Sequence, residues 1–426
     1  MERTCIAPGV HLSTAPADKF NRCRISIHFL FPAARETATA HALLPLVMER
    51  GYADCPDMTE LTKKLARLYG ADMSIYARSQ GANRNICIGV TGIKDSFALA
   101  GEALCQEYAQ MALGVAFRPY LVDGVFDDEA VAIEKRMLQK SLEDEINDKR
   151  LYCARGAQRT FYKDTPAGIR QEGYVEEVAG LSPADVTAAY QQMLRTASIE
   201  LVVLGYGAQT ETVKEMLLAA LAKVDRAPVA PIAPFFMQPM PTCHLSETFD
   251  IVQAKLCMAF TAGQAIDRNQ IERYRMAMAI FGGSVSSRLF LNVREKMHLC
   301  YYCSCSFNSA TGAMMVHSGV EPSNAAIAEQ AILKELAELC TGPITDEEFE
   351  DCRRGLVSGT NSVEDTLAGI ESWYYMEIMR GGAVHTPAEA RAALLAVTKE
   401  QVQEILAQFS LSVSYLVTKA EEGTDA

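Results

Sequence analysis

An arginine and a tyrosine seven residues apart, Arg294 and Tyr301, are the side chains in this sequence best suited to hold a peptide. A guanidinium carries five fixed N–H donors, and a phenol adds one O–H donor. At the end of a helix and the start of the next strand, the two groups could grip a peptide carbonyl from one side. A plainer alternative stays open, in which Arg294 pairs with a carboxylate and Tyr301 lies half-buried on a sheet.

The residues before Arg294 predict the helix that carries it. The adjacent glycines at 282–283 interrupt a helical pattern, so we expect the backbone to turn there. Ser286 or Ser287 can then cap a new helix that ends near Met297. Three apolar residues at helical spacing form its expected buried stripe: Leu289, Phe290 and Val293.

The residues that follow this helix, 300–307, are aromatic and small, which predicts a strand. Side chains alternate along a regular strand, so Tyr301, Cys303 and Cys305 should share one face. Cys300 and Cys303 should face opposite sides. Structural zinc needs four ligands, and these cysteines are therefore interpreted as packing residues rather than as a metal site.

This stretch resembles the C-terminal signature of the insulinase/pitrilysin/mitochondrial-processing-peptidase family. In that family a Ser-Arg-Leu-Phe is followed by Val-Arg-Glu-Lys and then by Ala-Tyr. The corresponding residues here are 287–290 (Ser-Arg-Leu-Phe), 293–296 (Val-Arg-Glu-Lys) and 300–301 (Cys-Tyr). The resemblance implies that Arg294 and Tyr301 lie opposite a zinc ion and bind the substrate backbone.

The same resemblance locates a zinc motif whose ligands are missing. The family carries His-x-x-Glu-His on its first helix, where the histidines bind zinc and the glutamate activates water. Residues 39–45 here read Thr-Ala-His-Ala-Leu-Leu-Pro, so Leu44 stands at the glutamate position and Pro45 at the second histidine. Only His41 is left, and one imidazole cannot make a zinc peptidase site. We expect no metal or other cofactor in this chain and a solvated or capping role for His41.

A downstream glutamate supplies the third zinc ligand in the family. Glu129 and Glu134 lie in the corresponding region. Without the first two ligands, both are expected to form an exposed helix face.

Two domains are expected, because 426 residues are too many for one ordinary core. Five of the 16 prolines fall between residues 228 and 241, which predicts a stiff linker. The predicted boundaries are an N-terminal domain over 1–225, a linker over 226–243 and a C-terminal domain over 244–426.

The second half repeats features of the first. The helix start at Asp128 returns at Asp346, and the cap at Ser182 returns at Thr398; the two offsets, 218 and 216 residues, agree closely. Alternating strand and helix patterns predict two homologous α+β domains, each a mainly antiparallel sheet packed against helices. The family resemblance implies that such halves close like a clamshell.

Composition excludes several function classes. A net charge of -13 argues against a nucleic-acid surface, and no apolar run approaches the ~20 residues of a membrane span. Residues 1–10 show no apolar signal segment. Thirteen cysteines scattered through an acidic chain are interpreted as reduced thiols in the cytoplasm.

The resemblance therefore predicts the metal-free subunit of a heterodimeric zinc peptidase that cleaves small or unfolded peptides. A homologous subunit bearing His-x-x-Glu-His would hold the zinc, and this chain would not be active alone. The nearest branch is the group of inactive subunits often labelled as associated with modification of elongation factor P. The alternative is a non-enzymatic peptide-binding or scaffold protein that forms a homodimer.

Overall fold

The computed structural model describes residues 1–381 and 383–420, which divide into two compact units. Unit 1 comprises Met1–Asp144 and Thr165–Ile232. Unit 2 comprises Glu145–Asp164 and the chain from Ala233 onward. Each unit packs helices against a mainly antiparallel sheet, which confirms the predicted α+β fold class.

Unit 1 is built on a six-stranded sheet with β3 and β5 near its centre. The strands lie in the order β1 (Glu2–Ala7), β2 (Val10–Ala15), β8 (Ser198–Leu204), β3 (Arg22–Pro32), β5 (Asn83–Ile93) and β4 (Asp72–Gln80). β2 and β8 run parallel, and the other neighbours are antiparallel. Both β3 and β5 are buried along almost their whole length, as expected of central strands.

The helices of unit 1 cover the core side of this sheet. They are α1 (Ala38–Glu49), α2 (Met58–Arg67), α3 (Leu104–Phe117), α4 (Asp128–Glu143), α6 (Val175–Val178), α7 (Pro183–Thr196) and α8 (Gln209–Leu221). Helix α3 packs on β3 and β5, α7 on β3, and α1 on β4. A small hairpin, β6 (Leu121–Val122) and β7 (Val125–Phe126), precedes α4. Helix α1, the place of the degenerate zinc motif, is thus fixed against the edge strand β4.

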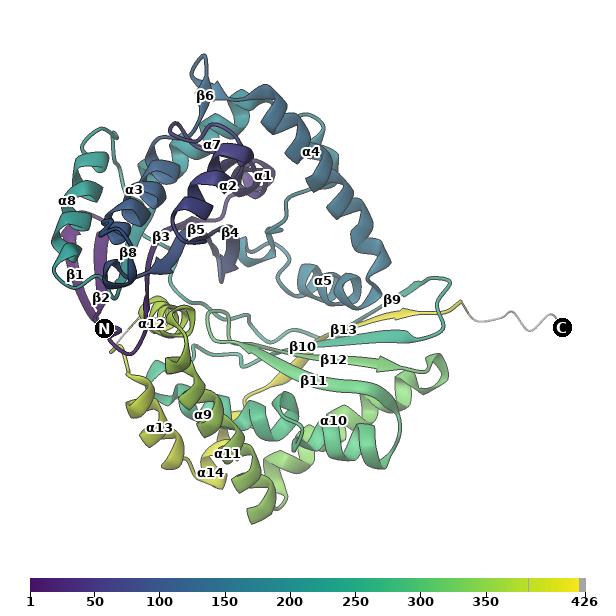
Figure 1. The fold of residues 1–426 in the computed structure, drawn as a ribbon. Coiled ribbons are helices and arrows are strands. Elements are labelled where there is room, and N and C mark those ends of the chain that lie inside the picture. Colours follow the sequence, from purple (N-terminus) through teal and green to yellow (C-terminus); the bar gives the residue numbers. More distant parts are fainter. Residues whose placement is uncertain (382, 421–426) are drawn as a thin grey trace. The chain divides into compact units, whose positions relative to one another are not determined.

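Unit 2 contains a five-stranded sheet in the order β11 (Cys300–Asn308), β12 (Ala313–Val320), β10 (Ala254–Thr261), β13 (Ser410–Thr418) and β9 (Cys243–Thr248). Its helices are α5 (Lys149–Phe161), α9 (Ile271–Met278), α10 (Ala325–Thr341), α11 (Asp346–Ser362), α12 (Leu367–Arg380), α13 (Pro387–Leu395) and α14 (Lys399–Leu406). Figure 1 shows α5 on one face of this sheet and α9, α10 and α11 on the other.

Helix α5 precedes the predicted linker in sequence but packs on the sheet of unit 2. Gly156 permits this packing, because a Cβ at this position would clash with the ring of Tyr415 on β13. The thiol of Cys153 also donates to the carbonyl oxygen of Lys255, with the sulfur 3.2 Å from the oxygen. A small residue and a buried thiol therefore bring this helix close to the sheet.

The two sheets share one order of strands. The order in unit 1, β2-β8-β3-β5-β4, corresponds to the order in unit 2, β9-β13-β10-β12-β11. The parallel pair, β2 with β8 and β9 with β13, has the same place in both sheets. Helices α7 and α14 both begin with a capping box, at Ser182 and at Thr398, as the sequence indicated. Across 1–381 and 383–420, no helix combines the length and apolarity that crossing a bilayer requires.

Candidate functional site

The helical segment that carries Arg294 is wider than an α-helix. Helix α9 continues into a π-helical stretch, η5 (Ala279–Gly283), and a second one, η6 (Leu289–Lys296), leads to β11. The π-helical stretch ends at Gly283 and the chain turns at residues 284–287, directly after the two glycines, which is close to the prediction. A Cβ at Gly282 would lie 2.7 Å from Leu289 Cδ1 and 2.9 Å from the Cys305 nitrogen. Glycine is needed here because two segments approach each other closely, not because of a turn.

The start of η6 lies close to its predicted position. The helical segment begins one residue after the predicted caps, with Arg288 in the N-cap position and no side-chain cap. Ser287 still lies at this start: its Oγ accepts from the Phe290 N–H at 3.4 Å and donates to the Ser284 carbonyl at 2.6 Å. Leu289 and Val293 are fully buried, whereas Phe290 is half-buried.

Arg288, whose role the sequence did not indicate, anchors η6 to the helices beneath it. Its guanidinium pairs with the carboxylate of Glu348 and donates to the Pro343 carbonyl at 2.9 Å. Four residues further on, Asn292 Nδ2 donates to Glu335 Oε2 at 2.8 Å. These contacts leave Arg294 as a basic side chain of the segment that is not fixed in the core.

Arg294 lies at the surface of unit 2, with 36% of its side chain exposed. Its guanidinium carbon is 4.5 Å from the centre of the Phe290 ring, and Nη1 is 3.2 Å from Glu295 Oε1. An exposed pair with an adjacent residue contributes little to stability and can exchange for another acceptor. The guanidinium is therefore held in place by the ring while its N–H groups stay accessible.

Tyr301 is the extra residue of a β-bulge. The register of β11 on β12 passes from Cys300 opposite Val320 directly to Tyr302 opposite Gly319. Tyr301 is 55% exposed, whereas Cys300 and Cys303 are both buried in the core of unit 2. The predicted alternation of faces was wrong, because a bulge shifts the phase of the strand by one residue. This shift turns the phenol of Tyr301 out of the core.

Polar and charged neighbours shift the pKa values of Cys300 and Tyr301. A hydrogen bond from Cys303 lowers the pKa of Cys300, burial opposes the shift, and the charge of Arg294 acts in the lowering direction. The Tyr301 hydroxyl donates to the carboxylate of Glu321, and this hydrogen bond raises the pKa of Tyr301.

The degenerate zinc motif lies in α1, in the core of unit 1. His41 is only 3% exposed; its Nε2 is 3.3 Å from the Ala189 carbonyl oxygen and its ring is 4.7 Å from the Phe31 ring. The prediction of a solvated or capping histidine was wrong, because α7 and β3 enclose the ring. Burial, with the positive charge of Arg84 as the second cause, lowers the pKa of His41 to about 4.

The residues of this motif do not fit a zinc ion. Leu44 and Pro45 are buried and offer no ligand atom, and Pro45 lies inside the helix. Glu129 is exposed, as expected. Glu134 is not, because its largely buried carboxylate pairs with Arg50 at 2.8 Å. A carboxylate neutralised in this way is a poor metal ligand.

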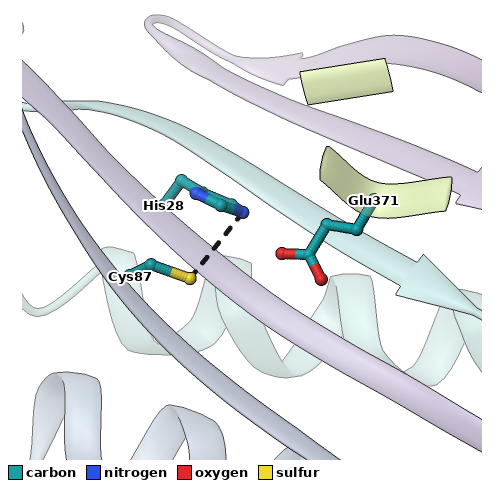
Figure 2. A group of neighbouring side chains, drawn as sticks. All are labelled: His28, Cys87 and Glu371. Atoms are coloured by element: carbon teal, nitrogen blue, oxygen red, sulfur yellow. Dashed lines mark hydrogen bonds between the residues drawn. The ribbon is translucent and has the colours of Figure 1, made fainter. Parts of the chain in front are cut away.

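A second pair of ligand-type side chains occurs on the sheet of unit 1. His28 on β3 lies opposite Cys87 on β5, with Nε2 3.8 Å from Sγ (Figure 2). The other ring nitrogen is 3.2 Å from Asn85 Nδ2. Glu371, also drawn in Figure 2, belongs to unit 2, so the pair within unit 1 has two ligand atoms where zinc needs three or four. The pair is therefore interpreted as a buried polar contact.

Comparison with known proteins agrees with a degenerate zinc motif. Residues 180–356 match the peptidase M16 inactive domain. The chain is 23% identical to the probable inactive metalloprotease YmfF of Bacillus subtilis (strain 168) over 420 residues, or 97% of each chain.

Solved structures show the same fold. A conserved protein from Enterococcus faecalis V583 superposes with a TM-score of 0.89 at 26% identity over 99% of both chains. A peptidase M16 inactive domain from Pseudomonas fluorescens superposes with a TM-score of 0.78 at 16% identity over 98% of both chains. The predicted resemblance is thereby confirmed: this chain is similar to inactive proteins of the M16 peptidase type, and residues 180–356 match the peptidase M16 inactive domain.

Proposed function

We propose that this chain is the metal-free subunit of a two-chain zinc peptidase and binds the peptide backbone through Arg294 and Tyr301. The observation that carries the proposal is the exposure of both side chains, each directly after a residue buried in the core. Val293 and Cys300 are in the core, yet the guanidinium and the phenol next to them face outward. The bulge at Tyr301 is the kind of feature that re-aims a side chain beside a binding site.

The surroundings of the pair suit an extended peptide. Three further apolar side chains between residues 285 and 301 are exposed: Val285, Leu291 and Met297. Such residues can contact side chains of a peptide while N–H and O–H donors hold its carbonyl groups. In the complex the Tyr301 hydroxyl would exchange its hydrogen bond to Glu321 for one to a substrate carbonyl. A donor of this type stabilises developing negative charge by roughly 3 kcal/mol in comparable sites.

The catalytic metal would come from a homologous partner bearing His-x-x-Glu-His. This assignment follows from the misfit of His41, Leu44 and Pro45 to zinc, which leaves this motif without the metal that would activate a water molecule. We place the pair in the cytoplasm, where the unpaired thiols of this chain stay reduced.

The exposed apolar side chains are also compatible with a second role, a peptide-binding scaffold that forms a homodimer without catalysis. The two functions differ in their partner. The peptidase requires a zinc-bearing homologue in the complex, whereas the scaffold self-associates and cleaves nothing. Mass measurement of the complex isolated from the native cell distinguishes a mixed pair from a dimer of identical chains.

Peptide binding by the purified chain tests the proposed site itself. Fluorescence anisotropy with labelled unfolded peptides of 10–20 residues would give the affinity of the wild type and of the variants Arg294→Ala and Tyr301→Phe. We expect at least about tenfold weaker binding in each variant, the loss of one charge-assisted or neutral hydrogen bond. Arg354→Ala, an exposed arginine on α11, is the matched control. Equal affinity in all four proteins would refute the assignment.

A further inference from the structure

Arg84 is a buried cation with few partners. It lies on β5 with 2% of its surface exposed and is among the largest fully buried side chains of the chain. Its Nη2 donates to the Arg170 carbonyl oxygen at 3.0 Å, whereas Nη1 is buried without a hydrogen-bond acceptor. Among the described residues no carboxylate comes within 4.0 Å of its guanidinium. A charge buried in this way is costly, so its retention needs a reason.

The position of Arg84 points to that reason. Its positive charge acts on His41, the one remaining residue of the zinc motif. Phe31 on β3 connects Arg84 on β5 with His41 on α1. Phe31 faces Arg84 across the β3–β5 ladder and packs its ring on the imidazole of His41. The guanidinium is therefore part of the surroundings of the degenerate motif.

A strap over residues 170–174 holds Arg84 there. Gln171 bonds to the edge of β4, accepting from Ser79 N at 2.6 Å and donating to the Ala77 carbonyl at 3.1 Å. Tyr174 N donates to Thr39 Oγ1 at 3.1 Å on α1. These bonds fix the Arg170 carbonyl that accepts from Arg84, so the guanidinium cannot readily turn away.

We propose that Arg84 is the resident cation of this half-site, and that its positive charge excludes a divalent metal independently of the ligands lost at Leu44 and Pro45. Two positive charges repel each other strongly in a buried, low-dielectric environment. A second ligand restored to α1 would therefore not restore metal binding while the guanidinium remains. This inference concerns unit 1 and does not depend on the roles proposed for Arg294 and Tyr301.

Substitutions in a P45H background test the proposal. P45H places a second imidazole four residues after His41, the spacing at which two histidines share a helix face. Leu44 is left unchanged because a carboxylate at this buried position would destabilise the fold. The series is P45H alone and P45H combined with R84M, R84Q or R84K. Zinc affinity is measured by competition with a chromophoric chelator, zinc content by mass spectrometry, and folding by circular dichroism.

Removal of the charge should raise zinc affinity at least about tenfold in P45H/R84M and P45H/R84Q. This is the smaller end of the range expected when the Coulomb repulsion between the guanidinium and the zinc ion is removed. R84K keeps the charge and should gain nothing. R226M is the second control, because Arg226 also donates to main-chain carbonyls, those of Leu194 and Ala197. If R84M fails to fold, R84Q retains a donor for the Arg170 carbonyl and the comparison stands.

Three results would overturn the proposal. Equal zinc affinity with and without Arg84 would show that its charge is irrelevant. Absence of zinc from every variant would show that the lost ligands alone exclude the metal. A gain in R84K equal to the gain in R84M would assign the effect to the size of the side chain rather than to its charge.

Discussion

The burial of His41 predicts a marked dependence of stability on pH. Its pKa is about 4 in the folded chain and 6.5 in the unfolded one, so the unfolded chain takes up the proton first as the pH falls. The stabilisation from this residue is therefore complete above pH 6.5 and is lost as the pH decreases from 6.5 towards 4. The difference between the two pKa values corresponds to about 3 kcal/mol of the free energy of unfolding.

The variant His41→Gln isolates this contribution. Glutamine does not titrate, and its side-chain N–H can still donate to the Ala189 carbonyl that accepts from the imidazole. Urea unfolding followed by circular dichroism at pH 7.5, 6, 5 and 4 gives the free energy of unfolding for both proteins. We expect the wild type to lose about 3 kcal/mol more than the variant between pH 7.5 and 4.

An exposed histidine provides the control for this experiment. His298 has a positive φ of 54°, a conformation that asparagine tolerates well, so His298→Asn should leave the pH dependence of the wild type unchanged. Parallel pH profiles for the wild type and His41→Gln would refute the reasoning, because they would mean that the imidazole is protonated as easily in the folded chain as in water.

Three further predictions concern unit 2. Gly282→Ala should destabilise the chain by about 1–3 kcal/mol in thermal unfolding, because its Cβ has no room between η6 and β11. Arg288→Met should cost about 3 kcal/mol in the same assay, because it leaves the carboxylate of Glu348 without its cation. Glu321→Gln should lower the pKa of Tyr301, because the hydrogen bond to the Glu321 carboxylate raises it. The ionisation of Tyr301 is followed by absorbance at 295 nm, as the difference between the titration curves of Glu321→Gln and of its double variant with Tyr301→Phe.

Local sequence patterns predicted the parts of the fold that depend on neighbours along the chain. The caps at Ser182 and Thr398 follow from a side-chain oxygen that accepts from a backbone N–H three residues later. The loss of the zinc motif at Leu44 and Pro45 could be predicted for the same reason, because ligand identity is a property of the sequence alone.

Features that depend on distant segments were not predictable. The bulge that exposes Tyr301 depends on the register of β11 against β12, which strand periodicity does not determine. The burial of His41 depends on α7, almost 150 residues further along the chain. Helix α5 packs on a sheet formed entirely by later residues, and a pattern read along the chain cannot show this.

Peptide cleavage by the mixed pair tests the central claim most directly. The chain is combined with the homologous His-x-x-Glu-His protein of the same genome, and turnover of an unfolded peptide is compared with that of each chain alone. We predict that only the pair cleaves the peptide. Arg294→Ala or Tyr301→Phe in this chain should lower kcat by about ten- to a thousandfold, because each variant removes a donor to the developing oxyanion. Unchanged turnover in both variants, or cleavage by this chain alone, would contradict the account.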